Sequence, residues 1–306
     1  MHTIELRRAV WLDQLVKKAN VLIEALPYIR NFCGKTFVIK YGGAAMVDES
    51  LRKAVALDLI LMRYVGLNPV VVHGGGPAIS KTMQRMGKEP VFVDGMRVTD
   101  AETMEIVEMV LVGRINKEIV SLINQHGGQA VGISGKDGNL IRARKMQNGK
   151  QDLGFVGEVT AIDPRIVNHL TEDGYIPVIT PVGMGEDGET YNINADLVAG
   201  RLAVALQAEK LIMLTDVEGI FANGQDPSSL ISQLSITKAR EMIASGQIRG
   251  GMIPKVTACI DALEHNVPRT HIIDGRKPHS LLLEIFTNQG IGTMVTKEGE
   301  DEFCTD

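Results

Sequence analysis

Short apolar runs rich in Val and Ile alternate along this chain with segments in which apolar residues recur at helical spacing. The clearest runs lie at residues 36–40, 70–72, 176–180 and 211–215. Buried strands separated by amphipathic helices are typical of a parallel sheet that is covered by helices on both faces. The sequence therefore predicts an α/β fold.

Local signals predict where several helices begin. Asp48 is expected to cap the helix after the first strand, and Pro77 has the first-turn position of another. Thr99–Glu102 has the form of a capping box and predicts a long helix ending near Gly127. Residues 140–160 are expected to form hairpins, with turns near Asn148-Gly149 and Gly154, that overhang the sheet.

The length and charge of the chain limit its organisation and its partners. Its 306 residues suit one large unit or two unequal lobes, and without a Pro/Ser-rich linker any lobes should share one continuous sheet. A net charge of −5 without a basic block argues against nucleic acid. No apolar run is long enough for a membrane span, and no secretory signal opens the chain, so we expect a cytoplasmic protein. Cys33, Cys259 and Cys304 are too dispersed for a metal knuckle and are expected to be reduced.

An apolar stripe precedes the first strand. Residues Leu12, Leu15, Val16, Ala19, Leu22 and Leu26 recur at helical spacing and predict an N-terminal helix of roughly six turns. The stripe can pack against its own domain or against another subunit, and the residues alone favour neither arrangement.

Three glycine-rich turns lie beside predicted strands or helices: residues 40–43, 73–76 and 250–252. Glycine lets backbone N–H groups approach an anion, and a following helix adds its partial positive charge. A single such turn more often makes a tight connection only. Three together, one containing Lys40 and one followed by Lys255, favour phosphate binding.

Two common nucleotide motifs are excluded. Gly34-Lys35-Thr36 resembles the end of a P-loop, but Ile29 stands where its leading glycine should be. The literal G-x-G-x-x-G at 183–188 contains Glu186 and Asp187, which would repel pyrophosphate, and no helix begins there. We interpret that segment as a loop and reject a dehydrogenase.

Polar residues stand before the predicted helix at 197–206. Asn192, Asn194 and Asp196 exceed what capping requires, so a ligand role for Asn192 or Asp196 is plausible beside the capping role of one of them. Arg97 can clamp a carboxylate through its planar guanidinium, although a surface arginine is the commoner case.

Taken together and in their order along the chain, these motifs resemble those of the amino acid kinase family. They are Lys40-x-Gly42-Gly43, His73-Gly74-Gly75-Gly76-Pro77, Gly95-Met96-Arg97-Val98-Thr99, Tyr191-Asn192-Ile193-Asn194-Ala195-Asp196 and Gly250-Gly251-Met252-x-Pro254-Lys255. The likeness runs from about residue 27 to 295, and the Arg97 and Asn192 motifs resemble the branch whose acceptor is N-acetyl-L-glutamate. It implies a three-layer αβα sandwich plus an N-terminal oligomerisation helix at 1–30, with an acyl-amino-acid-binding lobe at 31–190 and an ATP-binding lobe at 191–306.

The resemblance also implies residue roles. Lys40 and Lys255 would neutralise charge on the transferring phosphoryl group, and Asp196 would hold both lysines. Backbone donors at Gly42, Gly43 and Gly75 would face phosphates and acceptor. The acceptor would contact Gly75, Gly76, Arg97 and Asn192, and the nucleotide, carrying Mg²⁺ without a metal site in the protein, would lie by Gly42, Gly43, Asp216 and Gly251.

The implied reaction suits these residues as chemistry. An acceptor carboxylate, with a pKa of about 4.3, is ionised at neutral pH and needs no general base. The difficulty is to bring an anion to a polyanion, which requires fixed cations and N–H donors. His73, beside three glycines, is therefore expected to be structural.

Residues 271–293 resemble the arginine-sensitive subgroup of that branch. The likeness implies L-arginine as a feedback inhibitor bound near His271, Glu284 and Gly290, and a ring of six built from three dimers through the N-terminal helix. A strand and helix packed as core explain these residues equally well. A PII-type signalling protein binds some relatives, and the sequence leaves that partner open.

Two rival functions remain at this stage. One is a sibling kinase acting on glutamate, aspartate, carbamate or UMP. The other is a catalytically silent arginine-binding regulator, against which Lys40, Lys255 and Asp196 all speak.

Overall fold

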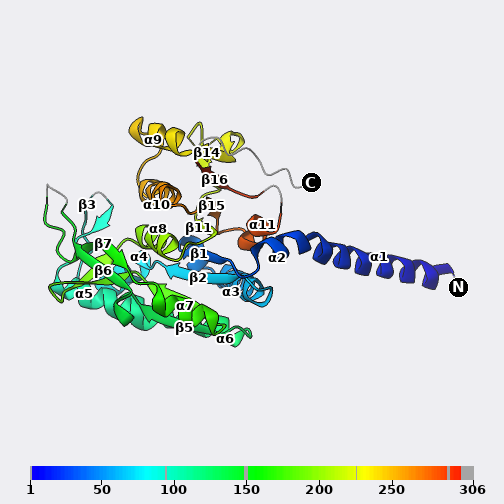
Figure 1. Cartoon of the computed structure of the whole chain (residues 1–306), viewed down its shortest axis with the longest axis horizontal. Coiled ribbons are helices and arrows are strands. Elements are labelled where there is room, and N and C mark those ends of the chain that lie inside the picture. Colours follow the sequence, from blue (N-terminus) through cyan, green and yellow to red (C-terminus); the bar gives the residue numbers. More distant parts are fainter. Residues whose placement is uncertain (1, 94, 148–150, 225, 288–289, 298–306) are drawn as a thin grey trace.

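The computed structural model describes residues 2–93, 95–147, 151–224, 226–287 and 290–297 (Figure 1). Within those residues the α-helices are α1 (His2–Glu24), α2 (Leu26–Phe32), α3 (Glu49–Tyr64), α4 (Gly76–Arg85), α5 (Ala101–Glu108), α6 (Asn116–Gln125), α7 (Arg165–Glu172), α8 (Ala195–Ala205), α9 (Ile236–Ala244), α10 (Met252–Glu264) and α11 (Ser280–Ile285). A π-helical segment, η2 (Met109–Ile115), joins α5 to α6, and short 3₁₀ turns lie at η1 (Gly43–Met46), η3 (Asp137–Asn139) and η4 (Pro227–Ser229).

The strands include those of an eight-stranded sheet in the order β14-β16-β15-β11-β1-β2-β8-β5. Their bounds are β1 (Thr36–Tyr41), β2 (Asn68–His73), β5 (Ala130–Ser134), β8 (Ile176–Thr180), β11 (Lys210–Thr215), β14 (Gln233–Ser235), β15 (Arg269–Asp274) and β16 (Thr293–Thr296). The pairs in this sheet are parallel except β15 with β16, so the predicted α/β fold with a mainly parallel sheet is confirmed.

Strand β1 joins the two halves of the chain. It pairs with β2 on one side and with β11, from the second half, on the other. Figure 1 shows β11, β15, β16 and β14 on one side of β1, and β2 and β5 on the other. The sheet therefore runs without a break from the first half of the chain into the second.

Alternation along β1 divides the interior into two cores. Phe37 and Ile39 point toward a core formed with α3, α4, α5, η2, α6 and α11. Val38 points to the opposite core, formed with α7, α8, α9 and α10. Because successive strand residues face opposite sides, Lys40 lies on the same face as Val38, the one covered by α8 and α10.

The helix starts agree with the sequence except for one. Asp48 caps α3 by accepting from Leu51 N–H, and Pro77 lies in the first turn of α4. The capping box that we placed at Thr99 is wrong by one residue, because Asp100 is the cap and accepts from Thr103 N–H. The Thr99 hydroxyl instead donates to the Arg97 carbonyl.

A small four-stranded barrel adjoins the main sheet. It is formed by β6 (Ile141–Lys145), β7 (Val156–Ile162), β9 (Val182–Gly185) and β10 (Thr190–Ile193), while β3 (Phe92–Val93) pairs with β4 (Met96–Arg97), and β12 (Ile220–Phe221) with β13 (Leu230–Ile231). The predicted hairpin strands near 140–160 are β6 and β7, but the predicted turn at Asn148-Gly149 lies outside the described residues. The interpretation of 183–188 as a loop is wrong for residues 183–185, which belong to strand β9 and pair with β10; residues 186–188 form the turn between these strands, and no helix begins there, as expected.

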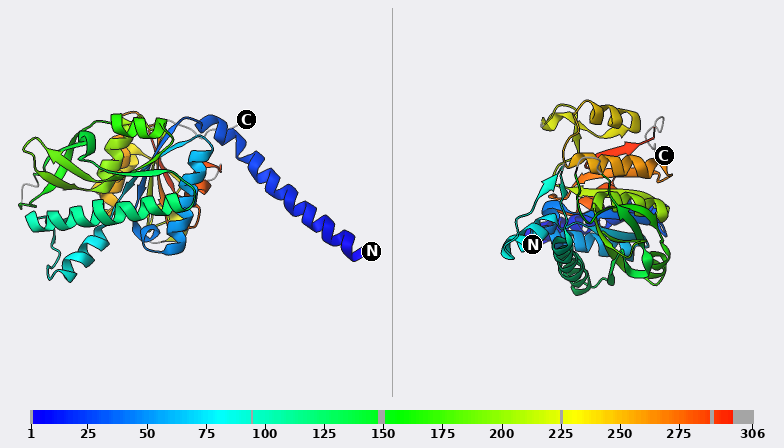
Figure 2. Two further views of the ribbon diagram at one scale, coloured as in Figure 1. Left: turned by 90° about the horizontal axis from the view of Figure 1, so that it is seen from below. Right: turned by 90° about the vertical axis from the view of Figure 1, so that its left-hand side faces the viewer.

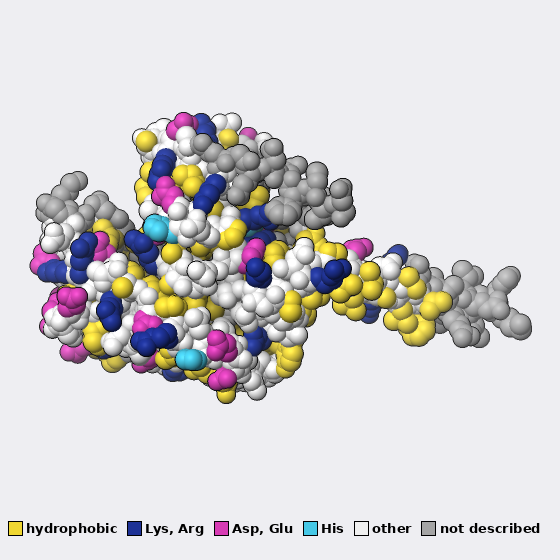
Figure 3. Space-filling model, in the orientation of Figure 1, with side chains coloured by type: hydrophobic (Ala, Val, Ile, Leu, Met, Phe, Trp, Pro, Cys, Tyr) yellow, Lys and Arg dark blue, Asp and Glu magenta, His cyan; other side chains and the backbone are white. Residues whose placement is uncertain are grey.

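Helix α1 extends away from the body of the molecule in Figures 1 and 2. From Trp11 onward its large apolar side chains are exposed, including 58% of Trp11 and 73% of Leu22, and they contribute to a yellow stripe in Figure 3. Packing of this stripe against its own domain is therefore wrong. Helix α2 contacts the body, where Phe32 packs edge-on against Phe37. None of the described helices has the length and apolar character that crossing a bilayer requires.

Candidate active site

Two lysines from distant parts of the chain meet at one carboxylate. Lys40 lies near the carboxyl end of β1, Asp196 in the first turn of α8 and Lys255 in the first turn of α10. Lys40 Nζ is 3.0 Å from Asp196 Oδ1, and Lys255 Nζ is 2.8 Å from Asp196 Oδ2. The three residues that the sequence singled out for charge stabilisation thus form one cluster.

Helices α8 and α10 set the position of this cluster. Asn194 caps α8 by accepting from Asp196 N–H and Leu197 N–H, so the Asp196 side chain is not used as a cap. Gly200 allows the two helices to pack closely, because a Cβ there would lie 3.0 Å from the Ala258 carbonyl oxygen. This close approach brings Lys255 beside Asp196.

The cluster is buried, and its charges shift the pKa values of Lys40 and Asp196. Burial lowers the pKa of Lys40, although the neighbouring Asp196 carboxylate opposes that effect. Burial alone would raise the pKa of Asp196, but the charges of Lys40 and Lys255 outweigh it and hold that pKa below its usual value. Lys40, Lys255 and Asp196 by themselves leave one positive charge, and the nearby Asp216 carboxylate balances it.

The turn that follows β1 has glycine at two positions where a Cβ would meet a charged side chain. A Cβ on Gly42 would lie 2.5 Å from Lys40 Nζ, so the lysine head occupies the space that a side chain would fill. Gly43 has φ +70°, and a Cβ there would lie 2.2 Å from Asp216 Oδ1. The predicted nucleotide residues Gly42, Gly43 and Asp216 are therefore brought together around Lys40. Gly251 directly precedes α10, and no packing contact requires a glycine there.

The predicted acceptor residues form a second group. Arg97 is buried, and its Nη2 donates to the Gly76 carbonyl at 2.9 Å and to Ser80 Oγ at 2.8 Å. The commoner alternative, a surface arginine, is wrong here. Asn192 Nδ2 lies 3.4 Å from Thr99 Oγ1, which in turn donates to the Arg97 carbonyl, so Thr99 links the two predicted residues.

Gly75 is held by residues that the sequence did not reveal. A Cβ on Gly75 would lie 2.4 Å from Leu111 Cδ2 and 2.6 Å from Ile115 Cδ1. Both side chains come from the π-helical η2, and π segments inside helices are frequent at functional sites. The apolar period of 101–125 continues through η2 as in an ordinary helix, so the sequence carries no signal for it.

The C-terminal cluster predicted for arginine is also assembled. His271 Nδ1 lies 2.6 Å from Glu284 Oε1, and the Ile291 N–H donates to Glu284 Oε2 at 2.8 Å. Gly290 has φ +57° and would place a Cβ 3.2 Å from the same carboxylate. Burial alone would raise the pKa of Glu284, but the hydrogen bonds from His271 and Ile291 hold it below its usual value. Lys210 lies nearby, 5.0 Å above the Phe32 ring of α2, and burial lowers its pKa to about 8.

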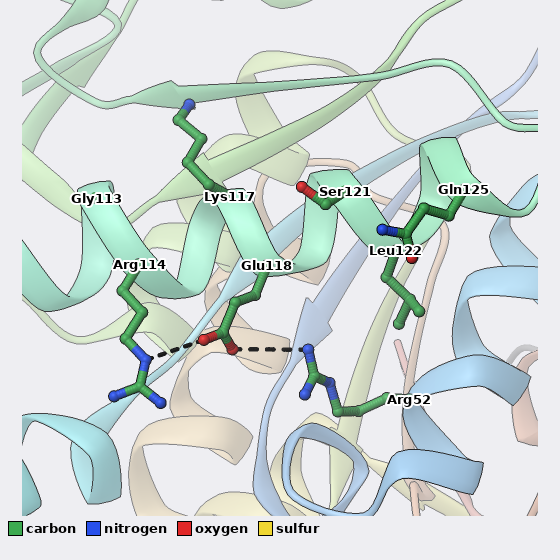
Figure 4. Close-up of a pocket in the computed structure, with 8 residues that line it drawn as sticks. All are labelled: Arg52, Gly113, Arg114, Lys117, Glu118, Ser121, Leu122 and Gln125. Carbon is green, nitrogen blue, oxygen red and sulfur yellow. Dashed lines mark hydrogen bonds and ion pairs between the residues drawn. The ribbon is translucent and has the colours of Figure 1, made fainter.

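A separate surface depression of about 470 Å³ lies on α3, η2 and α6. Figure 4 shows Glu118 between Arg52 and Arg114, at 3.6 Å and 2.9 Å respectively. None of the predicted site residues lines it. Its ion pairs belong to exposed side chains, and such pairs hold helices together only weakly.

This arrangement, a mainly parallel sheet with two lysines and a carboxylate at its centre, defines a phosphotransferase fold. The model of the amino acid kinase family matches residues 35–274, and the chain belongs to that family. Within it, the chain is similar to "Acetylglutamate kinase" of Thermoanaerobacter pseudethanolicus, with 59% identity over 298 residues, covering 97% of this chain and 99% of that protein.

Two solved structures have the same fold. The N-acetylglutamate synthase from Neisseria gonorrhoeae complexed with coenzyme A and N-acetyl-glutamate has a TM-score of 0.80 at 28% identity. The same enzyme complexed with coenzyme A and L-arginine has a TM-score of 0.76 at 27% identity. Each match covers 92% of this chain, which spans only 64% and 65% of those two chains.

Proposed function

We propose that this enzyme phosphorylates the side-chain carboxylate of N-acetyl-L-glutamate with MgATP, giving N-acetyl-L-glutamyl 5-phosphate for arginine biosynthesis. The observation that carries the proposal is the contact of Lys40 and Lys255 with one Asp196 carboxylate. The identity to acetylglutamate kinases over nearly the whole chain supports this acceptor over glutamate, aspartate, carbamate or UMP.

The charges fit a nucleotide polyphosphate. Lys40 and Lys255 supply two ammonium groups for phosphate oxygens, and Gly42 and Gly43 in the adjacent turn place no side chain over their backbone N–H groups. In the proposal, residues 191–306 hold ATP by way of Asp216 and Gly251, and residues 31–190 hold the acceptor. Mg²⁺ arrives with the nucleotide and supplies charge neutralisation on its phosphates.

The chain's own residues act by binding and orienting. Arg97 and Asn192 grip the α-carboxylate and acetamido groups of the acceptor, so that its side-chain carboxylate faces the lysine cluster. A carboxylate oxygen forms the new bond to the γ-phosphorus, the bond to the β-phosphate oxygen breaks and ADP leaves. No proton has to be removed, so no general base is required. Lys40 and Lys255 stabilise the charge on the transferring group, and Asp196 keeps both in place.

A hydroxylamine trap tests the reaction, because hydroxylamine converts an acyl phosphate into a coloured hydroxamate. We expect hydroxamate only with ATP and N-acetyl-L-glutamate present together. ADP release with glutamate, aspartate, carbamate or UMP but not with N-acetyl-L-glutamate would identify a sibling kinase. No ADP release with any acceptor would identify the silent regulator.

L-arginine binding at the C-terminal cluster is the second part of the proposal. The Glu284 carboxylate uses two of its roughly four acceptor positions on His271 and Ile291, which leaves two for a guanidinium. The likeness to the arginine complex of the synthase supports this ligand.

The third part of the proposal concerns oligomerisation through the N-terminal helix. The exposed stripe of α1 suits a second copy of the chain, and we propose that it pairs dimers into a ring of six.

Each of these two proposals has its own test. Glu284→Gln should abolish inhibition by millimolar arginine, whereas Glu264→Gln, which changes an exposed ion pair with Arg240, should leave that inhibition intact. Light scattering should show a smaller particle after deletion of residues 1–24, and an unchanged mass would contradict the role of α1.

A further inference from the structure

A chain of buried hydrogen bonds runs from helix α6 to the acceptor-side glycine turn. Asn116, the first residue of α6, donates from Nδ2 to the Val178 carbonyl at 2.8 Å and to Thr180 Oγ1 at 3.2 Å. Thr180 Oγ1 is 3.0 Å from His73 Nε2, and His73 Nδ1 is 2.9 Å from the Gly74 carbonyl oxygen. Asn116, Thr180 and His73 are all fully buried.

The direction of every bond in this chain follows from its last acceptor. A carbonyl oxygen can only accept, so His73 Nδ1 carries the proton. Burial lowers the pKa of His73 to about 4, so the ring is neutral at physiological pH and Nε2 has a free lone pair. The Thr180 hydroxyl therefore donates to Nε2, which Asn116 Nδ2 also approaches at 3.4 Å, and accepts from Asn116. The bonds from Asn116 through Thr180 and His73 thus point toward Gly74, whereas the other Asn116 bond goes to the Val178 carbonyl.

The sheet makes this arrangement rigid. Val72 on β2 pairs with Ile179 on β8, so His73 and Thr180 are the next residues in register and project from the same face. On the neighbouring strand β5, a Cβ on Gly132 would lie 1.7 Å from Asn116 Oδ1. Glycine at 132 thus leaves the space on the face of β5 that the Asn116 amide occupies.

The last hydrogen bond of this series, from His73 to Gly74, sets the direction of the Gly75 N–H donor. The Gly74 carbonyl and the Gly75 N–H belong to one planar trans peptide, in which the two groups point in opposite directions. When His73 fixes the carbonyl oxygen, it also fixes the direction of the Gly75 N–H on the far side. Leu111 and Ile115 pack against Gly75 itself and prevent its displacement toward η2.

We propose that His73, Thr180 and Asn116 are positioning residues, which aim the Gly75 N–H at the phosphoryl acceptor. The proposal rests on the function proposed above, because the acceptor is the group that this donor meets. In this proposal η2 and the adjoining Asn116 act on the same glycine turn. Side chains of η2 pack against Gly75, and Asn116 acts through Thr180 and His73 on the Gly74 carbonyl. None of the three side chains touches substrate in this proposal.

The first test compares Thr180→Val with Thr180→Ser, since valine keeps the shape but loses the hydroxyl and serine retains it. We expect Thr180→Val to lower kcat/KM for N-acetyl-L-glutamate by on the order of 10- to 100-fold, as small misorientation of a reacting group does. The dissociation constant for ADP, measured by calorimetry, should change less than about twofold, and Thr180→Ser should restore most of the activity.

Other outcomes separate the two proposals. If the unmodified enzyme forms no acyl phosphate, the proposed function fails. If it does, and Thr180→Val has unchanged kcat/KM per folded molecule while only its Tm falls, the residues are merely structural and the inference is overturned. Equal losses in Thr180→Val and Thr180→Ser would overturn it as well.

The second test addresses the last bond of the chain directly. In His73→Asn the side-chain amide takes the place of Nδ1 and can still donate to Gly74, whereas in His73→Gln it takes the place of Nε2 and cannot. We expect the asparagine variant to retain more acceptor kcat/KM than the glutamine variant. Nitrogen-15 spectra of the unmodified enzyme should show His73 as the neutral Nδ1–H tautomer at pH 7. An Nε2–H tautomer would refute the proposed series of hydrogen bonds.

Discussion

Replacement of Asp196 by asparagine isolates the central electrostatic feature of the site. The change keeps nearly the same shape but removes the anion that separates Lys40 from Lys255. At 3.0 Å and an effective dielectric constant of about 20, one such contact contributes roughly 5 kcal/mol before desolvation is subtracted. Removing one partner of a buried ion pair typically costs about 3–5 kcal/mol, because the remaining charge is left uncompensated.

The same change should affect catalysis and its pH dependence. With the lysines no longer held in place, kcat should fall by about 10²- to 10³-fold, as when a preorganised donor is lost. The Asp196 carboxylate opposes the burial that lowers the pKa of Lys40, so its loss should lower that pKa further. Lys40 must be protonated to act, and activity should therefore decline at a lower pH in Asp196→Asn than in the unmodified enzyme.

Coupled measurement of ADP release between pH 6 and 10, with urea unfolding, checks both effects. Asp261→Asn is a matched control, since Asp261 lies on α10 but is 28% exposed and 3.4 Å from Arg201. Its unfolding free energy should change by less than about 1 kcal/mol. The reasoning is refuted if Asp196→Asn keeps its kcat, or if the alkaline limb of its pH profile stays where it was.

Three further predictions use other parts of the structure. Lys40→Ala or Lys255→Ala should lower kcat by on the order of 10²-fold, and near-normal turnover in either would contradict its role in charge stabilisation. Arg97→Lys should raise KM for the acceptor by roughly tenfold and leave KM for ATP unchanged, because lysine lacks the planar fork; equal effects on both substrates would count against an acceptor site. Burial raises the pKa of Asp58, which pairs with His279, from 3.8 to about 6. The folded state then binds this proton more tightly than the unfolded state, so stability should fall by about 3 kcal/mol as pH rises from about 4 to 6. Asp58→Asn should remove that decline in urea unfolding, and parallel curves for both proteins would disprove it.

Much of the main sheet could be predicted because its strands are buried on both faces. Such strands are continuous apolar runs, and those at 36–40, 70–72, 176–180 and 211–215 lie in β1, β2, β8 and β11. The cap at Asp48 and the position of Pro77 were also readable, because both depend on local geometry. The grouping of Lys40 with Lys255 came from ordered motifs, since no local pattern joins residues so far apart.

The features that were missed depend on tertiary contacts. The π-helical η2 arises where Leu111 and Ile115 pack against Gly75, and an apolar helical period looks the same with or without it. Thr180 and Asn116 have no motif of their own, because their function depends on the register of β2 with β8. For Arg97 taken alone a surface position was the commoner expectation, and its contacts with Gly76 and Ser80 depend on the tertiary fold.

The central position of β1 has a mechanical consequence. Lys40 stands on a strand that is hydrogen-bonded to β2 on one side and to β11 on the other, so the proposed acceptor-binding and nucleotide-binding parts of the chain share one hydrogen-bonded ladder. Opening them would require either rupture of that ladder or elastic twisting of the whole sheet. Admission of substrates must therefore rely on flexure of the sheet or on the loops at its carboxyl edge.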